Sequence, residues 1–133
     1  NLEHLGRTDS NEGPQKARLS PTGYDFSEIT DVLKQAGAMT GVEIYNNTAA
    51  SDAFFNRSDN AALAEAGIPS TTVCVAFEFP DYHGAADHWD KVDYDNMAQV
   101  DRTLLGTLWL LAERTTPLKW NEANDKTKKY RQP

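Results

Sequence analysis

Apolar residues follow the spacing of regular structure in three segments of the chain. Within residues 26–37 they recur every three or four positions, which predicts an amphipathic helix that Gly37 or Gly41 ends. A longer stripe of the same period over residues 96–114 predicts a second helix. Residues 71–77 are apolar or β-branched without alternation, a pattern typical of a central strand covered on both faces.

Between these segments, weaker sequence patterns indicate two further short elements. Residues 42–45 predict a short strand, and residues 58–66 a short helix that Ser58 or Asp59 caps. Because helices alternate with strands, the pattern predicts an α/β fold: a partial three-layer sandwich in which helices flank a mixed β-sheet. The remaining segments are expected to be a strand end (residues 1–6), two loops (residues 7–23 and 81–95) and a polar surface tail (residues 118–133).

The charge balance excludes one class of function. The net charge is -7 and the pI about 4.8, whereas nucleic-acid binding requires clustered Lys and Arg side chains. No apolar stretch approaches the roughly 20 residues that span a bilayer. The single cysteine, Cys74, permits no internal disulfide and lies in an apolar run, where we expect it to be buried.

Candidate chemistry centres on the histidines, of which there are three. His83 follows the central strand, and the loop beyond the carboxyl end of such a strand is where open α/β sheets build their sites. Its imidazole suits a metal ligand or a general base. Glu3 ends another candidate strand, and carboxylate with imidazole is a ligand combination that zinc accepts. The alternatives are that His83 is an ordinary loop histidine and that Glu3 is a solvated acid at the end of a strand, neither with a chemical role.

Three blocks of sequence resemble the co-catalytic di-zinc exopeptidases, which include bacterial leucyl aminopeptidases, glutamate carboxypeptidases and glutaminyl cyclases. The similarity runs from Asn1 to about Glu113. Two positions depart from the family pattern: Glu3 stands where Asp is usual, and Asn60 where His is usual. The blocks are Asn1-Leu2-Glu3-His4-Leu5-Gly6; Arg57-Ser58-Asp59-Asn60 with the later turn Gly67-Ile68-Pro69-Ser70; and Asp81-Tyr82-His83-Gly84 with Asp87 and Trp89-Asp90-Lys91-Val92-Asp93.

The resemblance implies a role for four residues. His83 would be the final zinc ligand and Glu3 would bind the other zinc ion of the pair. Tyr82 would offer its phenol to the developing oxyanion, and Asp59 would lie near the substrate end of the site. Residues 1–117 would then form the C-terminal half of an aminopeptidase catalytic domain that cleaves N-terminal residues from peptides, followed by the tail of residues 118–133.

The family also uses an upstream His-x-Asp segment, a bridging Asp and a Glu-Glu pair, and the sequence contains no Glu-Glu pair. We therefore expect the polypeptide alone to have little or no catalytic activity and the missing N-terminal half of the domain to be its partner. We also expect self-association, because the exposed sheet edge can pair with another chain.

A glutaminyl cyclase-like transferase is one alternative, although those cyclases usually have Trp where this chain has Tyr82. A non-catalytic remnant that binds peptides or a partner is another. Bacterial relatives favour a periplasmic or secreted location. The peptidase interpretation requires the His83 imidazole to face a cleft near Glu3 and Tyr82.

Overall fold

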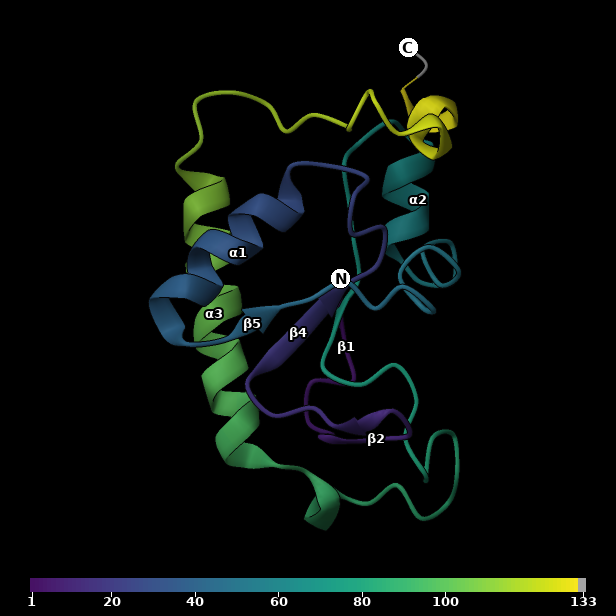
Figure 1. Ribbon diagram of the computed structural model, residues 1–133, viewed down its shortest axis with the longest axis vertical. Helices are drawn as coiled ribbons and strands as arrows, with labels where there is room; N and C mark the ends of the chain where they lie inside the picture. The colour runs from purple at the N-terminus through teal and green to yellow at the C-terminus, as the bar shows by residue number, and fades with distance from the viewer. Residues whose placement is uncertain (132–133) are drawn as a thin grey trace.

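A computed structural model describes residues 1–131 and contains a mixed four-stranded sheet in the order β1-β6-β4-β5 (Figure 1). Strand β1 runs parallel to β6, and β4 runs parallel to β5, while β4 and β6 are antiparallel. The expected mixed sheet is therefore confirmed. The strands are short: β1 (Leu2–Glu3), β4 (Arg18–Pro21), β5 (Glu43–Ile44) and β6 (Val73–Cys74).

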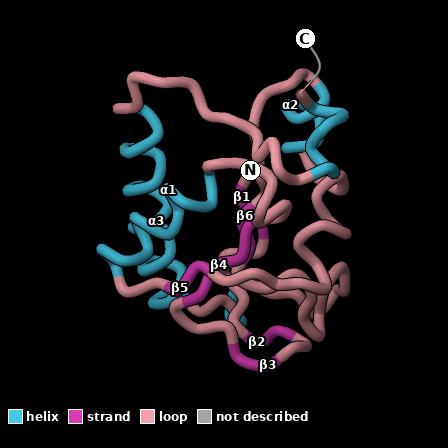
Figure 2. The backbone as a smooth tube through the Cα atoms, turned by 45° about the horizontal axis from the view of Figure 1, so that its top comes forward, coloured by secondary structure: helices cyan, strands magenta, loops and turns pink. Residues whose placement is uncertain are grey.

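Helices α1 (Ile29–Thr40) and α3 (Tyr94–Ala112) pack against each other beside the sheet (Figure 2). Residues around β6 alternate between two cores, as strand geometry requires. Val73 and Val75 join the core beneath α1 and α3, whereas Cys74 joins Ala50 and Phe77 in a separate cluster. The segment is thus a central strand covered on both faces, as its unbroken apolar pattern predicts.

The C-terminal segment differs from the surface tail that its polarity predicts. Trp120 and Tyr130 are buried and stack on each other, and both contact Phe55. They enclose an aromatic cluster beside the short helices α2 (Asn60–Glu65) and η2 (Asp125–Tyr130). Two well-spaced aromatic residues are enough to anchor an otherwise polar segment, because each buries a large apolar ring. Residues 132 and 133 of the expected tail lie outside the described part of the chain.

The interpretation of residues 7–23 as a loop is wrong. This segment contains a hairpin of β2 (Asp9–Ser10) and β3 (Gly13–Pro14), followed by the inner strand β4. Strand β4 contains Ser20 and Pro21, residue types common in turns, and the charged Arg18, although Leu19 and Ser20 are completely buried. Pairing on both sides overrides that local preference.

Helix α1 begins at Ile29, three residues later than the periodicity predicts, because Phe26 belongs to the aromatic cluster instead. It ends at Gly41, which adopts the left-handed conformation (φ 74°) that terminates many helices. Gly37 lies inside the helix, and a Cβ atom at that position would lie 2.4 Å from the Val42 carbonyl oxygen. Its small size therefore permits close contact between the helix and the chain that follows.

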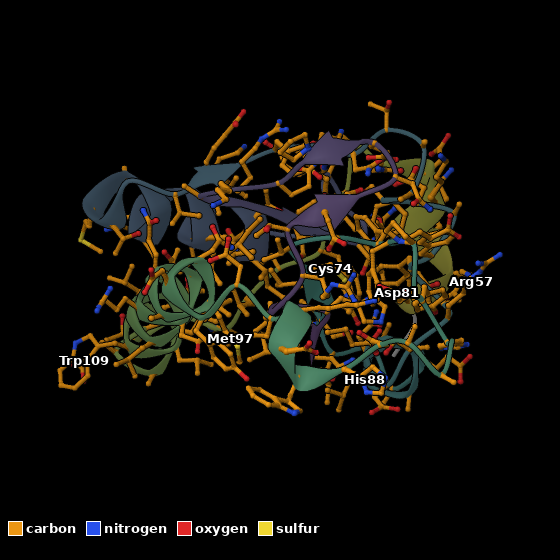
Figure 3. The ribbon with its side chains drawn as sticks, turned by 90° about the horizontal axis from the view of Figure 1, so that it is seen from below. Arg57, Cys74, Asp81, His88, Met97 and Trp109 are labelled. Carbon is orange, nitrogen blue, oxygen red and sulfur yellow. The ribbon has the colours of Figure 1, made fainter. Side chains whose placement is uncertain are left out.

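Helix α3 begins at Tyr94 and is only partly buried. Val100 and Leu104 face the core, whereas Leu105, Leu108 and Trp109 are more than half exposed. Figure 3 shows Trp109 pointing outward at the edge of the molecule, so the full width of the predicted apolar stripe is not covered. Over residues 1–131, no helix is both long and apolar enough to cross a membrane.

Candidate functional site

The carboxyl ends of β1 and β6 bring two candidate residues into one cleft. These strands are parallel, with Glu3 paired to Cys74, so the chain leaves both strands at the same edge of the sheet. Glu3 and Tyr82 line this cleft, and residues of the segment directly before α2 line it as well. The cleft residues are Glu3, His4, Thr22, Phe54, Arg57, Ser58, Thr72, Cys74, Phe77, Glu78 and Tyr82.

The Glu3 carboxylate is held by hydrogen bonds. Its Oε1 accepts from the Ser58 hydroxyl and from the Asn1 side-chain amide at 2.9 Å. The Asn1 amide also donates to Ser58 and to Thr72, which in turn donates to the buried Asn60. The network joins β1 to the start of α2 and fixes the direction in which the carboxylate points.

Tyr82 lies within a group of rings at the mouth of the cleft. Its ring stacks on His83 with centroids 4.0 Å apart and meets His4 and Phe79 edge-on at 5.1 and 5.6 Å. The Tyr82 phenol has no hydrogen-bond partner among the residues described. It is therefore free to donate to a bound substrate.

The two histidines that contact Tyr82 share an uncommon backbone conformation. His4 and His83 have φ angles of 52° and 56°, which non-glycine residues rarely adopt and which cluster at functional sites. His4 Nδ1 lies 3.2 Å from the Ala76 carbonyl oxygen, and because that oxygen only accepts, Nδ1 carries the proton. The imidazole of His4 is thus anchored to the chain that follows β6.

His83 and Asp59 lie outside the cleft. The His83 imidazole is exposed and reaches the site only through its stacking on Tyr82, so it does not face the cleft as the peptidase interpretation requires. Asp59 is exposed at the start of α2, where its side chain makes no capping hydrogen bond. The zinc role of His83 and the substrate role of Asp59 stay predictions.

Arg57 and Cys74 line the cleft without having been expected there. The Arg57 guanidinium lies over the Phe54 ring at 4.3 Å and forms no ion pair within residues 1–131, so an unpaired cation lines the same cleft as Glu3 and Tyr82. Figure 3 shows Arg57 at the outer edge of the molecule. Its position in the sequence, directly before Ser58 of the second resembling block, is the signal that could have indicated a place for Arg57 in the cleft. Burial, reinforced by Glu3, raises the pKa of the Cys74 thiol to about 12, so it is an inert apolar group rather than a nucleophile.

The described residues do not form a complete metal site. Over residues 1–131, no three His, Cys, Asp or Glu side chains lie close enough together to hold one ion. A structural or catalytic zinc site needs at least three protein ligands. Glu3 and His83 would each need further ligands from outside this group, and no chemical step through zinc can be derived from these residues alone.

Comparison with known proteins gives one result at the level of the family. A model of peptidase family M28, a family of co-catalytic zinc peptidases, matches residues 1–108. Searches of curated proteins and of solved structures gave no match. The matched range includes both strands of the cleft, the loop that carries Tyr82 and His83, and most of α3. It covers well over half of the chain, and the chain belongs to peptidase family M28.

Proposed function

We propose that this chain forms part of a zinc-dependent aminopeptidase that removes N-terminal residues from peptides. Glu3 binds zinc in the complete domain, and His83 binds zinc there after its imidazole, exposed in the chain alone, turns toward the cleft. Tyr82 donates a hydrogen bond to the oxyanion of the tetrahedral intermediate, and Asp59 lies toward the substrate. Hydrogen-bond donors aimed at a developing charge stabilise the transition state more than the ground state.

One observation carries the proposal: Tyr82 and Glu3 line the same cleft at the carboxyl end of two parallel strands. The two residues are 79 positions apart in the sequence, and open α/β sheets bind their ligands at this edge. The free phenol and the oriented carboxylate have the chemical properties that the assigned roles require. The match to a zinc peptidase family supports the reaction class.

We propose that the remaining zinc ligands come from the other half of the catalytic domain, which docks beside β1. Within the described residues β1 pairs with β6 alone, so its outer edge carries backbone groups that a further strand can bind. An apolar groove adjoins this edge and is lined by Leu2, Leu63, Leu104 and Leu108, three of which are about half exposed or more. A polypeptide that pairs with β1 would cover the groove and place its own ligands next to Glu3.

Zinc calorimetry combined with an aminoacyl reporter substrate tests this function. The chain alone should bind zinc weakly and hydrolyse nothing, and adding the complementing half should produce both zinc binding and hydrolysis. Glu3→Gln and His83→Ala should weaken zinc binding, by about 10-fold or more for each lost ligand. His88→Ala is the matched control, because this exposed histidine lies on the same loop outside the cleft.

The absence of a three-ligand cluster among the described residues favours a second candidate, a remnant that binds peptides or a partner without catalysis. In the same experiment, peptide binding without zinc uptake or hydrolysis would identify the remnant. Cyclisation of N-terminal glutamine would instead identify a transferase. Any of these outcomes would overturn the aminopeptidase assignment.

A further inference from the structure

The loop that carries Tyr82 and His83 is anchored by a single buried side chain. Arg7 follows β1, and its guanidinium is only 4% exposed. Nε and Nη2 donate to the two oxygens of Asp9 at 2.8 and 2.6 Å, Nη1 donates to Asp87 at 2.6 Å, and Nη2 also donates to Asp81 at 2.9 Å. One guanidinium thus connects three carboxylates from two distant parts of the sequence.

The two loop carboxylates flank the candidate site residues. Asp81 directly precedes Tyr82, and Asp87 lies four residues after His83, so Arg7 holds the loop on both sides of them. Lys91 adds a second cation to Asp81 at 2.7 Å. The Arg7 guanidinium also covers the ring of Phe79, with its carbon 4.4 Å from the centroid, and Phe79 contacts Tyr82 edge-on.

We propose that Arg7 is a positioning residue: it fixes the loop of residues 79–91 against the end of β1 and thereby holds the Tyr82 phenol at the mouth of the cleft. The catalytic consequence depends on the function proposed above, whereas the anchoring of the loop does not. Tyr82 is 39% exposed and its phenol lacks a hydrogen-bond partner within the described residues, so apart from the rings of His4, Phe79 and His83 only the anchored loop holds it in place.

The geometry requires a guanidinium and not merely a positive charge. Arg7 uses the planar fork of its nitrogens for four hydrogen bonds in different directions, two of them to one carboxylate. A lysine ammonium presents a compact charge on a flexible stem and cannot reproduce this fork. Arg7→Lys therefore separates the anchoring role from charge neutralisation.

The chain offers matched variants for the test. Asp87→Asn weakens only the ion pair between Arg7 and Asp87 and leaves Arg7 in place. It therefore still tests the proposal if Arg7→Lys fails to fold. Arg18→Lys is the control, because Arg18 also pairs with a carboxylate, Glu43 at 2.7 Å, and also lies over an aromatic ring, that of Tyr45 at 4.0 Å. Arg18 belongs to β4, and both of its partners lie in or directly after β5, so neither belongs to the loop.

Nuclear magnetic resonance of the imidazoles provides the readout, because the full chain has three histidines and two of them contact the Tyr82 ring. Arg7→Lys and Asp87→Asn should shift the His4 and His83 signals, and protection of loop amides from hydrogen exchange should fall about tenfold while core amides stay protected. Arg18→Lys should change neither. Unchanged His4 and His83 signals in a folded Arg7→Lys or Asp87→Asn variant would overturn the proposal.

The complemented enzyme supplies the kinetic arm of the test. Arg7→Lys should lower kcat for the aminoacyl reporter about 10- to 100-fold with little change in KM, because a misplaced donor loses transition-state stabilisation rather than substrate binding. A rise in KM at constant kcat would contradict the positioning role. If the wild-type complex hydrolyses nothing, the proposed function fails, and the histidine spectra still decide whether Arg7 anchors the loop.

Discussion

On the face of the sheet that α1 and α3 cover, apolar side chains such as Leu19, Leu33 and Val75 are almost completely buried and pack against one another. At the carboxyl end of β1 and β6, a buried arginine and three aspartates hold an exposed loop in place instead. The first arrangement excludes water and supplies stability. The second leaves side chains accessible while fixing their positions, which is what a site for a substrate requires.

The largest expected effect lies on the helical side. Leu33 is 1% exposed in the core beneath α1, so Leu33→Ala should lower the free energy of unfolding by about 2–5 kcal/mol through lost burial and an unfilled cavity. Urea denaturation of the variant and the wild type measures this difference in the free energy of unfolding. Leu105→Ala is the control on α3, where the side chain is 68% exposed and the change should stay within about 0.5 kcal/mol. Equal losses at both positions would contradict the assignment of the core.

A pair of glycine substitutions should change stability in opposite directions. Gly37→Ala would place a Cβ 2.4 Å from the Val42 carbonyl oxygen, and the displaced backbone should cost about 1–3 kcal/mol. Gly106→Ala on the facing helix meets only Ala36 at an ordinary 3.7 Å and should stabilise the helix by about 0.5–1 kcal/mol. Thermal unfolding of the two variants measures the difference, and stabilisation by Gly37→Ala would show that α1 and the chain after it are packed less closely.

The loop side should respond to acid before the helical side does. Hydrogen bonds lower the pKa of two carboxyl groups on this side below the ordinary value of 3.8. Arg7 lowers the pKa of Asp9 in β2, and Lys91 together with Arg7 lowers the pKa of Asp81 in the loop. A carboxyl group whose pKa is lower in the folded state stabilises fully above its unfolded pKa, and this contribution is lost as the pH falls through the folded pKa. We therefore expect the loop amides to lose protection below about pH 4, while the core amides stay protected.

Arg7→Gln should remove most of this acid response, because Asp9 then loses the partner that lowers its pKa. Hydrogen exchange followed from about pH 5 downward makes the comparison with the wild type. A pH dependence that is the same in the variant and the wild type would show that Arg7 does not control the titration of Asp9.

Periodicity identified the elements whose packing is apolar. The two long helices were visible because their apolar side chains repeat with the period of a helix. Strand β6 was visible as an unbroken apolar run, because both of its faces are buried. Strand β4 was missed because pairing with β5 and β6 stabilises it in spite of Arg18, Ser20 and Pro21. The packing of residues 118–131 was missed because its two anchoring residues, Trp120 and Tyr130, leave no period in a polar segment.

The candidate site was predicted only in part, for a related reason. The motif around Tyr82 and the strand end at Glu3 were found from the resemblance, and the parallel pairing of β1 with β6 places both residues at one cleft. The exposure of His83 follows from a loop whose path depends on Arg7, Asp81 and Asp87, a long-range charge network that no local pattern encodes. Zinc binding, self-association and an extracytoplasmic location stay predictions.

The central claim is that the Tyr82 phenol acts on the substrate from the edge of the cleft that contains Glu3. Tyr82→Phe removes only the hydroxyl group and keeps the ring that contacts His4 and His83. Steady-state kinetics of the complemented enzyme on an aminoacyl reporter should show kcat lowered about 10²- to 10³-fold with KM nearly unchanged. A Tyr82→Phe enzyme with wild-type kcat would contradict the account.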